Sequence, residues 1–409
     1  MSPDPLRIAL LTYRGNPHSG GQGVYVRYLS RALVELGHRV EVMSGQPYPE
    51  LDPGVVLTPL ASLDLYRPDD PFRTPRLSEF RDWIDVLEYA AMCTAAFPEP
   101  LTFSLRAARY LREHHERFDV VHDNQCLGYG LLDIQRRIPL VTTIHHPVTI
   151  DARLEKQNAP PERRLTLMRW YAFTRMQRRV ARRLRGVITA SGTGRDDAVE
   201  EFGLAPERVS VVHNGVDTDL FKPVPDQKRV PGRLITTTSA DVPIKGLAYL
   251  IEALAKLRTE HDAHLIVVGK PRKNVQAAIE RFGMQPHVRF ETKIDSLRIV
   301  ELYASSEVAI IPSLYEGFSL PAAEAMACEV PVVATTGGAL PEVIGTDGDA
   351  GLLVEPRDAS ALANAIGRLL DQPALAASMG AAGRARVLER FTWRKAAERT
   401  VAEYRKVMS

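Results

Sequence analysis

The stretch Pro312-Ser-Leu-Tyr-Glu-Gly-Phe-Ser-Leu-Pro-Ala-Ala-Glu-Ala-Met-Ala-Cys-Glu-Val-Pro331 is the part of the chain from which the fold is read. The apolar, β-branched segment Val308 to Ile311 precedes it and is too short for a helix, so it predicts a buried strand. Helix formers follow from Ala322 to Cys328, with Ser319 as the expected N-cap and Pro321 in the first turn. The unit is therefore a strand, a tight loop and a helix.

The loop in this unit is suited to hold hydroxyl or phosphate groups. The first helical N–H groups, around Gly317 to Leu320, have no partner within the helix, and the helix dipole adds partial positive charge at that end. Glu316 is expected in the loop and Glu324 about one turn into the helix. Two carboxylates on different elements cannot act as an acid and base pair on one helix face, but they can hold two parts of one long ligand.

The pattern Ser-x2-Glu-Gly-Phe-x-Leu-Pro-x2-Glu-Ala-Met-Ala resembles the Glu-x7-Glu motif of retaining glycosyltransferases with the GT-B fold, family 4. The resemblance implies that the first carboxylate and the amides after it contact the transferred sugar, and that the second carboxylate binds the ribose of a nucleotide. The residues so implied are Glu316, Gly317, Phe318, Ser319, Leu320 and Glu324. The plain alternative is a solvated loop carboxylate and a helix-surface carboxylate.

Length and composition indicate a globular protein of two domains. A chain of 409 residues exceeds the size at which one core keeps growing. The hydrophobic content of 45%, the charged content of 25% and the net charge of +2 point to no particular partner, and not to nucleic acid. The cysteines Cys93, Cys126 and Cys328 lack metal-ligand spacing, and we see neither a signal peptide nor an apolar run of membrane-spanning length. We therefore expect a cytoplasmic protein.

A glycine-rich loop follows the first predicted strand, Arg7 to Tyr13. Its residues Gly20, Gly21 and Gly23 would let backbone approach a ligand closely and present N–H groups at a helix start. The spacing is not the dinucleotide-binding pattern Gly-x-Gly-x-x-Gly, because Val26 occupies the last position. A plain tight turn is the alternative. The loop also resembles the Gly-Gly loop of family 4, which implies a place near the donor phosphates and the acceptor.

Polar residues end two further predicted strands. His122, Asp123 and Asn124 end or directly follow the strand that begins at Asp119, and carboxyl ends of parallel strands point at the ligand crevice. They are candidates for acceptor contact, with a capped strand end as the equal alternative. The segment Pro139 to Pro147 is a buried strand that runs into two histidines. The resemblance selects His145 rather than His146 as the histidine beside the reacting sugar.

An arginine-rich helix is predicted from Pro161 to Arg185. Helical geometry puts apolar residues on one stripe and most arginines on the opposite face. This face is either solvated or docks on anionic lipid headgroups, which attract polybasic clusters. The second possibility would make the protein peripheral on the inner face of a membrane.

Alternating strands and helices predict parallel sheets with helices on both faces. The polar, proline-rich segment Lys222 to Gly232 reads as a linker. With the resemblance, this implies the α/β GT-B architecture, in which two doubly wound Rossmann-like domains face each other across a cleft. We assign residues 1–221 to the acceptor domain, 222–391 to the donor domain, and 392–409 to a C-terminal helix that packs back on the first domain.

One family landmark is incomplete. The family pattern Gly-Arg-x4-Lys-Gly supplies an arginine and a lysine for the donor diphosphate, and this chain has Lys245 but Ala240 in place of the arginine. A diphosphate in a dry cleft needs more than one positive charge. Lys270, Arg272 and Lys273, after another predicted strand, could supply the remainder.

The resemblance implies a retaining glycosyltransferase that moves a sugar from a nucleotide-sugar donor to a lipid, glycan or small-molecule acceptor, with His145, Glu316 and Lys245 at the reaction centre. No metal and no cofactor are expected, because Lys245 and amides would replace the metal; Asp217-Thr-Asp219 and Asp347-Gly-Asp349 are too short a pattern to indicate one. A nucleotide-sugar epimerase of the same fold and a protein that binds sugar nucleotides without catalysis are the alternatives. The loop after Phe290 lacks the usual glycine, so the base stays open.

Overall fold

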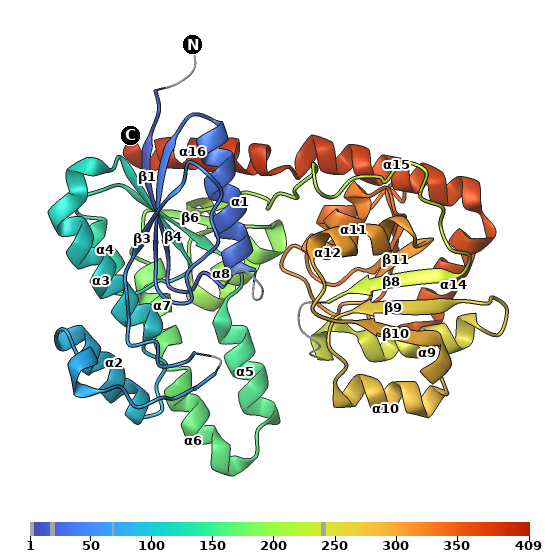
Figure 1. Cartoon of the computed structure of the whole chain (residues 1–409), viewed down its shortest axis with the longest axis horizontal. Coiled ribbons are helices and arrows are strands. Elements are labelled where there is room, and N and C mark those ends of the chain that lie inside the picture. The colour runs from blue at the N-terminus through green and yellow to red at the C-terminus, as the bar shows by residue number, and fades with distance from the viewer. Residues whose placement is uncertain (1–3, 17–20, 68, 239–242) are drawn as a thin grey trace. The chain divides into compact units, whose positions relative to one another are not determined.

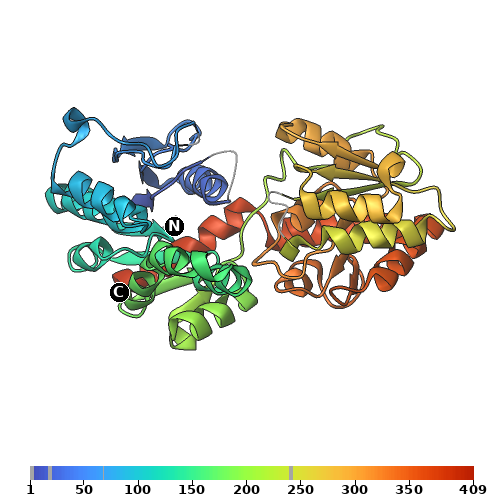
Figure 2. The same ribbon diagram turned by 90° about the horizontal axis from the view of Figure 1, so that it is seen from below.

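The computed structural model describes residues 4–16, 21–67, 69–238 and 243–409 (Figure 1). The chain forms two compact units, one made of Met1–Val212 with Ala396–Ser409 and the other of His213–Lys395. The chain thus passes from the first unit to the second before the proline-rich segment that was predicted to be the linker. It passes back to the first unit within the last helix. Each unit contains one parallel sheet, and Figures 1 and 2 show helices flanking both sheets.

The first unit has a seven-stranded sheet in the order β3-β2-β1-β4-β5-β6-β7. Every pairing is parallel, and the order grows outward from β1 in both directions, which is the doubly wound arrangement. The strands are β1 (Arg7–Thr12), β2 (Arg39–Ser44), β3 (Val56–Pro59), β4 (Val120–Asn124), β5 (Leu140–Ile144), β6 (Gly186–Thr189) and β7 (Val209–Val211). The helices of this unit are α1 (Gln22–Glu35), α2 (Trp83–Cys93), α3 (Glu99–His114), α4 (Gly130–Ile134), α5 (Val148–Asn158), α6 (Pro161–Trp170), α7 (Phe173–Ala181) and α8 (Gly192–Phe202), with 3-10 turns at Leu77–Glu79, His115–Arg117 and Pro206–Arg208.

The second unit repeats the plan with six strands in the order β10-β9-β8-β11-β12-β13, again all parallel. The strands are β8 (Arg233–Thr237), β9 (His264–Val268), β10 (Val288–Glu291), β11 (Val308–Ile311), β12 (Val332–Thr335) and β13 (Leu352–Val354). The helices are α9 (Leu247–Leu257), α10 (Lys273–Phe282), α11 (Ser296–Ala304), α12 (Leu320–Ala327), α13 (Leu340–Ile344), α14 (Ala359–Asp371) and α15 (Pro373–Arg390), with 3-10 turns at Pro243–Lys245 and Gln285–His287. The predicted fold class, two Rossmann-like α/β units, is confirmed.

The central strands are buried on both faces, and β4 ends in the buried polar residues His122, Asp123 and Asn124. Every residue of β11, β4 and β5 is buried. Because helices cover both faces of such a sheet, its strands read as apolar runs and not as alternating patterns. Polar groups therefore collect where the strands end, and the sites described below lie at those ends.

The last helix, α16 (Trp393–Met408), belongs mainly to the first unit. Thr392 caps it, since its Oγ1 accepts a hydrogen bond from the Lys395 amide at 3.3 Å. Farther along, the Tyr404 hydroxyl lies 2.7 Å from His122 Nδ1, and Glu403 accepts from Ser210 Oγ at 2.8 Å. As predicted, the C-terminal helix packs back on the first sheet.

The single helix predicted from Pro161 to Arg185 is wrong. The structure has two helices, α6 and α7, and the chain turns between them at Tyr171 and Ala172. Tertiary context overrides a local helical pattern here. The end of α6 and the start of α7 meet in an aromatic cluster, in which the rings of Trp170 and Phe173 both lie against Phe97, with centroid distances of 5.1 and 5.4 Å.

Candidate functional site

Glu316 and Lys245 form the centre of the polar group in the second unit. Lys245 Nζ lies 2.9 and 3.0 Å from the two carboxylate oxygens of Glu316. Glu316 Oε1 also accepts a hydrogen bond from Ser313 Oγ at 2.7 Å, and the carboxylate is largely buried. The structure thus brings together two of the three residues predicted at the reaction centre, from segments 71 positions apart.

Gly246 fixes the position of Lys245. Its φ is +69°, and a Cβ there would lie 1.9 Å from the carbonyl oxygen of Pro312, so no larger residue fits. The Leu314 amide donates to the Ile244 carbonyl at 2.7 Å, which ties the same two segments again. The lysine is therefore held next to the loop after β11 by backbone packing and not only by its charge.

A second turn supports the backbone of Glu316. The amide of Ala339 donates to the Glu316 carbonyl at 2.9 Å. Gly338, at φ +65°, lies so close that a Cβ would approach that carbonyl oxygen to 2.3 Å. The glycine turn after β12 thus positions the loop that carries Glu316.

Ser319 differs from its prediction as a side-chain N-cap. It occupies the N-cap position of α12, but its backbone is left-handed (φ 77°, ψ 77°) and its side chain makes no capping hydrogen bond. Its Oγ is buried and lacks a hydrogen-bond partner among the described residues. A strained residue with an unused buried hydroxyl at a helix N-terminus suits a polar ligand better than a structural cap.

Phe318 anchors this loop to the body of the unit. Its side chain is buried and lies edge-on to Phe391, at a centroid distance of 5.6 Å. The family resemblance implies that Phe318 contacts the sugar. Because its side chain is buried, only its backbone amide could make this contact. Leu320 begins α12 directly after Ser319 and is half-buried.

Glu324 lies in α12 and is half-buried. Burial raises the pKa of its carboxyl to about 7, and no described residue offers the carboxylate an ion pair or a hydrogen bond. Its charge also raises the pKa of the nearby Tyr303 phenol, after burial, the larger cause. The carboxylate is thus neither paired nor enclosed in an apolar core, and it can accept hydrogen bonds from a ligand.

Three cations follow β9. Lys270, Arg272 and Lys273 are exposed, at the start of α10, and none of them forms an ion pair with a described residue. Ala240, the position of the missing family arginine, lies outside the described residues. The exposed cations are therefore available to anions.

The first unit places His145 against Asn124. His145 Nε2 lies 2.6 Å from Asn124 Oδ1, and an amide oxygen can only accept, so Nε2 carries the proton. Burial lowers the pKa of His145 to about 4, which keeps the ring neutral at pH 7. The edge of Tyr25 packs on the ring with a centroid distance of 4.6 Å, and the His145 amide donates to Gln125 at 2.6 Å. Gln125 was not predicted; its positive φ of 55° is a signal that only the structure gives.

His122 and Asp123 are held inside the first unit. His122 is fully buried, and its two ring nitrogens contact Tyr404 and the Thr143 hydroxyl, each at 2.7 Å. Asp123 accepts from the Cys126 and Leu127 amides and from Thr142, and burial raises its pKa to about 6. These contacts favour a capped strand end over acceptor binding. Asn124 contacts His145 through its side-chain oxygen.

The glycine loop after β1 is described from Gly21 onward, and Gly20 lies outside the described residues. Gly21 has φ +70° and precedes α1. Gly23 is buried, and a Cβ there would lie 2.1 Å from the carbonyl oxygen of Asn16. Gly23 is thus required by a close backbone approach within the loop, and Gly21 is exposed where α1 begins.

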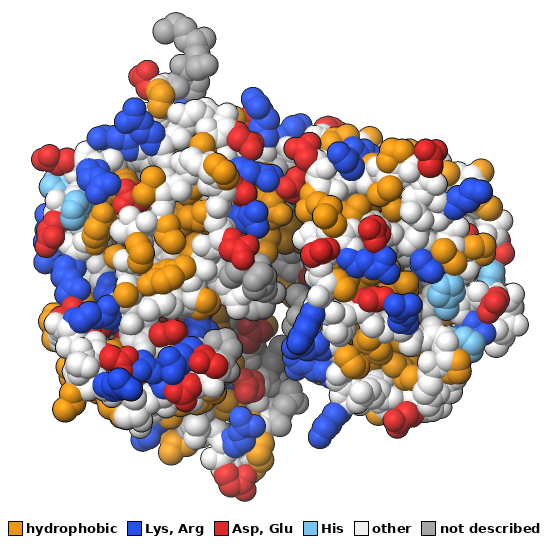
Figure 3. All heavy atoms as spheres, viewed as in Figure 1, with side chains coloured by type: hydrophobic (Ala, Val, Ile, Leu, Met, Phe, Trp, Pro, Cys, Tyr) orange, Lys and Arg blue, Asp and Glu red, His pale blue; other side chains and the backbone are white. Residues whose placement is uncertain are grey.

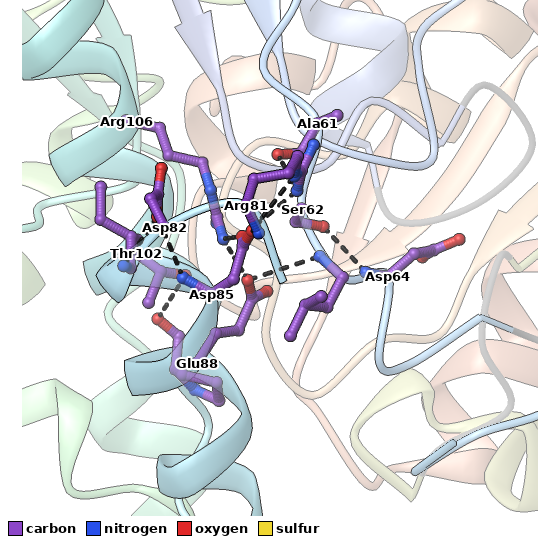
Figure 4. A network of polar contacts seen from close by, with 12 residues as sticks. Ala61, Ser62, Asp64, Arg81, Asp82, Asp85, Glu88, Thr102 and Arg106 are labelled. Atoms are coloured by element: carbon purple, nitrogen blue, oxygen red, sulfur yellow. Dashed lines mark hydrogen bonds and ion pairs between the residues drawn. The ribbon is translucent and has the colours of Figure 1, made fainter. Parts of the chain in front are cut away.

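A network of buried charges lies beside β3 and was not predicted. Arg106 of α3 is buried and reaches Asp85 and Glu88 of α2, as Figure 4 shows. Arg81 donates to Asp85 and to the carbonyl of Ala61, where the chain leaves β3. A charged cavity of about 320 Å³ opens beside these residues. The network joins α2 and α3 to the edge of the sheet, and apart from Glu88 Oε1 its carboxylate oxygens are paired.

The nine arginines of α6, α7 and the turn after α7 are all exposed, and none forms an ion pair with a described residue. Elsewhere, on the face in Figure 3, basic and acidic side chains are interspersed. Two apolar side chains of α6, Leu165 and Met168, are 59% and 53% exposed. The described residues include no helix both long and apolar enough to cross a bilayer. They also include no cluster of three His, Cys, Asp or Glu side chains that could hold a metal ion.

The family model described as Glycosyltransferase Family 4 matches residues 19–220, and the one described as Glycosyl transferases group 1 matches residues 232–372. A protein of Mycolicibacterium hassiacum named MMP alpha-(1->4)-mannosyltransferase is 51% identical over 99% of both chains. The D-inositol 3-phosphate glycosyltransferase of Acidothermus cellulolyticus is 27% identical over 99% of this chain and 91% of its own.

Solved structures share the fold. Sucrose-phosphate synthase from Thermosynechococcus elongatus superposes with a TM-score of 0.73 at 24% identity, over 98% of both chains. Anabaena HepE in complex with UDP-glucose superposes with a TM-score of 0.70 at 18% identity, over 98% of this chain and 100% of that one. The fold is thus found in proteins whose solved complexes contain a nucleotide sugar.

Proposed function

Since the chain belongs to the glycosyltransferases of family 4 and group 1, we propose that it transfers a mannosyl residue from a nucleotide-activated donor to a hydroxyl of a carbohydrate acceptor, with retention of configuration. The choice of mannose is based on the 51% identity, over 99% of both chains, with a protein named as an α-(1→4)-mannosyltransferase. For the same reason we propose that the new linkage is α-(1→4). The paired Lys245 and Glu316 beside the start of α12 supply the chemistry.

The bond that breaks joins the anomeric carbon to the phosphate oxygen, and its electron pair leaves with the phosphate. The acceptor oxygen forms a bond to the same carbon on the same face, and its proton passes to the departing phosphate oxygen. Lys245 and the amide end of α12 stabilise the negative charge that develops on the phosphate. Glu316 accepts hydrogen bonds from sugar hydroxyls and so orients the ring relative to Lys245.

The remaining residues hold the two ends of the donor and the acceptor side. Ser319 Oγ, which has no partner among the described residues, hydrogen-bonds the donor. Glu324 accepts hydrogen bonds from the ribose diol. Neutral His145, with its Nε2 proton directed to Asn124, presents its other ring nitrogen as an acceptor for a sugar hydroxyl.

Lys270, Arg272 and Lys273 compensate the charge of the donor diphosphate in place of the missing family arginine. Their support is their exposure and their lack of acidic partners. Removing these charges should raise the dissociation constant of the nucleoside diphosphate, and more at low salt than at high salt. Equal affinity of the triple variant Lys270→Gln, Arg272→Gln and Lys273→Gln would contradict the proposal.

The deciding experiment incubates the purified protein with GDP-mannose or UDP-glucose, with and without α-linked mannose oligosaccharides. We expect nucleotide release that depends on acceptor, and a product whose anomeric proton shows the α-configuration by NMR. A β-linked product would contradict retention. Isomerisation of the donor without nucleotide release would identify an epimerase, and binding without turnover would identify a non-catalytic protein.

The transfer needs no metal and no cofactor beyond the donor, because Lys245 and helix amides meet the phosphate charge. The rate in excess EDTA should then equal the rate with Mg²⁺. A rate that collapses in EDTA and returns with a divalent cation would overturn this part of the proposal.

The protein acts in the cytoplasm, where the free thiols of Cys93, Cys126 and Cys328 stay reduced. The arginines of α6 and α7 dock on anionic lipid headgroups. They are exposed and form no ion pair with a described residue, and the exposed apolar side chains of Leu165 and Met168 lie on α6. Sedimentation with vesicles that contain phosphatidylglycerol should carry the protein down at low salt, and vesicles of phosphatidylcholine should not. Equal behaviour with both vesicles would contradict the docking.

A further inference from the structure

His213 is the first residue of the second unit, and it lies between three segments of that unit. Its side chain is 9% exposed, and its Nε2 lies 2.6 Å from Glu342 Oε1. The ring packs edge-on against Phe391 at a centroid distance of 5.3 Å and tilts against Phe318 at 6.2 Å. One imidazole thus contacts α13, the loop after β11 and the segment before α16.

The backbone directly after His213 is held against the segment that precedes α16. The Val216 amide donates to the Phe391 carbonyl at 2.8 Å, and Val216 forms a parallel bridge with Thr392. A Cβ on Gly215 would lie 2.3 Å from the amide nitrogen of Trp393. His213 is therefore held in place by backbone contacts independent of its own side chain.

Two routes lead from this side chain to Glu316. The first is Phe318, two residues after Glu316, whose ring packs on His213. The second is α13: Glu342 lies in its first turn, and Ala339, directly before the helix, donates its amide to the Glu316 carbonyl. Both segments that fix Glu316 therefore contact His213.

A further contact, from α15, also holds α13. Arg386 of α15 donates to the carbonyls of Glu342 and Val343 at 2.9 and 2.8 Å, and its guanidinium lies over the Phe391 ring. Because Arg386 already fixes the backbone of α13, the hydrogen bond from His213 is not needed to hold this helix in the fold. The hydrogen bond from His213 should instead determine the exact position of the loop that carries Glu316.

We propose that His213 is a positioning residue for the transfer reaction, which sets the place of Glu316 through Phe318 and Glu342. It contacts no reacting atom in this arrangement. The inference rests on the proposed function, since it assigns Glu316 to the sugar. A placement error of about 1 Å costs a reaction of this kind roughly 100-fold in rate.

The variants separate the hydrogen bond from the packing. His213→Phe keeps a ring between Phe318 and Phe391 but removes the bond to Glu342, and Glu342→Ala removes the bond from the other side. Glu342→Gln keeps an acceptor oxygen and serves as the conservative rescue. The matched control is His261→Phe, which removes another histidine–carboxylate contact of the second unit, with Asp371 at 3.0 Å.

We expect His213→Phe and Glu342→Ala each to lower kcat at least tenfold and to raise the donor KM at least fivefold. The kcat of the double variant should be no lower than that of the single variants, because both substitutions remove the same hydrogen bond between His213 and Glu342. Glu342→Gln should stay within threefold of the unchanged protein, and His261→Phe should not differ from it. A kcat within twofold in His213→Phe and in Glu342→Ala, or additive losses in the double variant, would overturn the proposal.

Binding of GDP-mannose and UDP-glucose, compared with GDP and UDP, gives a readout that does not need turnover. If Glu316 is misplaced, the affinity for the nucleotide sugar should fall at least fivefold while that for the nucleoside diphosphate stays constant. If the unchanged protein binds a nucleotide sugar without transferring it, the proposed function fails. The ratio of its affinities for the nucleotide sugar and the nucleoside diphosphate still tests the role of His213. If His213→Phe and Glu342→Ala both leave the ratio unchanged, His213 has no positioning role.

Discussion

Lys245 Nζ and the carboxylate of Glu316 are joined by two contacts of 2.9 and 3.0 Å. Their side chains are 24% and 10% exposed, so the ion pair is only partly shielded from water. Backbone contacts at Gly246 and Ala339 hold both residues. The pair is therefore pre-organised, and a donor would meet charges already in position.

The first prediction concerns this pair. Glu316→Gln keeps the shape but removes the charge that orients both Lys245 and the sugar, so kcat/KM should fall about 100-fold to 1,000-fold, the cost typical of losing one pre-organised polar contact. Steady-state rates with purified protein measure this. The control is Lys256→Ala, which breaks the exposed pair with Glu252 and should change nothing. A loss below fivefold in Glu316→Gln would remove this carboxylate from the mechanism.

The second prediction separates backbone strain from chemistry at Ser319. Ser319→Gly should raise the melting temperature, since glycine adopts a φ of 77° without penalty, and Ser319→Ala should not. Both lose the hydroxyl, so both should weaken donor binding. Calorimetry with and without the nucleotide sugar measures the two effects together. Full donor affinity in Ser319→Ala would show that the unused hydroxyl has no ligand.

The third prediction is a pH dependence from Glu324. Its pKa is raised to about 7, so the carboxyl is mostly protonated at pH 6 and mostly ionised at pH 8. Hydrogen bonds to an ionised acceptor are stronger, and the donor KM should therefore fall as pH rises through about 7. Glu324→Gln should flatten this profile. If the profile of the variant keeps its slope, the dependence belongs to another group.

The fourth prediction concerns stability and Glu99. Burial raises the pKa of this carboxyl to about 8, and Arg14, 2.9 Å away, offsets only part of that effect. The unfolded chain loses this proton near pH 4.5, whereas the folded protein keeps it until about pH 8. The contribution of Glu99 to stability is therefore fully present below about pH 4.5 and is lost as pH rises toward 8, at most about 1.4 kcal/mol per pH unit.

Glu99→Gln should remove this part of the pH dependence, and urea unfolding at pH 5 and pH 8 measures it. The control variant is Glu35→Gln, which makes the same substitution at an exposed carboxylate of α1. The predicted effect is a loss of unfolding free energy between pH 5 and pH 8. If the unfolding free energy instead rises over this range in the unchanged protein but not in Glu99→Gln, the predicted sign is wrong.

Local patterns predicted most elements of both sheets. The segment Val308 to Ile311 is a strand with the bounds that its apolar run indicates, and the last helix begins after Thr392 as its capping chemistry requires. Strands buried on both faces have no alternation to misread, and helices with their own periodicity separate most of them along the chain. These are properties of neighbouring residues, which a sequence displays directly.

What could not be predicted depends on residues far apart in the chain. The turn at Tyr171 lies between two helices whose aromatic residues share Phe97 as an anchor, and no local pattern reveals that contact. His122 looks like a free polar residue at a strand end until Tyr404, 282 positions later, takes one of its nitrogens. Ser319 has the residue type of a cap, but the approach of neighbouring backbone decides its conformation.

The contact between His122 and Tyr404 has a consequence for the order in which the protein is made. All seven strands of the first sheet emerge from the ribosome before the second unit. The buried His122 Nδ1 in the middle of that sheet, however, contacts the hydroxyl of Tyr404, which is synthesised after the second unit. Domains generally fold in the order of their synthesis. Here the half of the protein that is translated first is the half that is completed last.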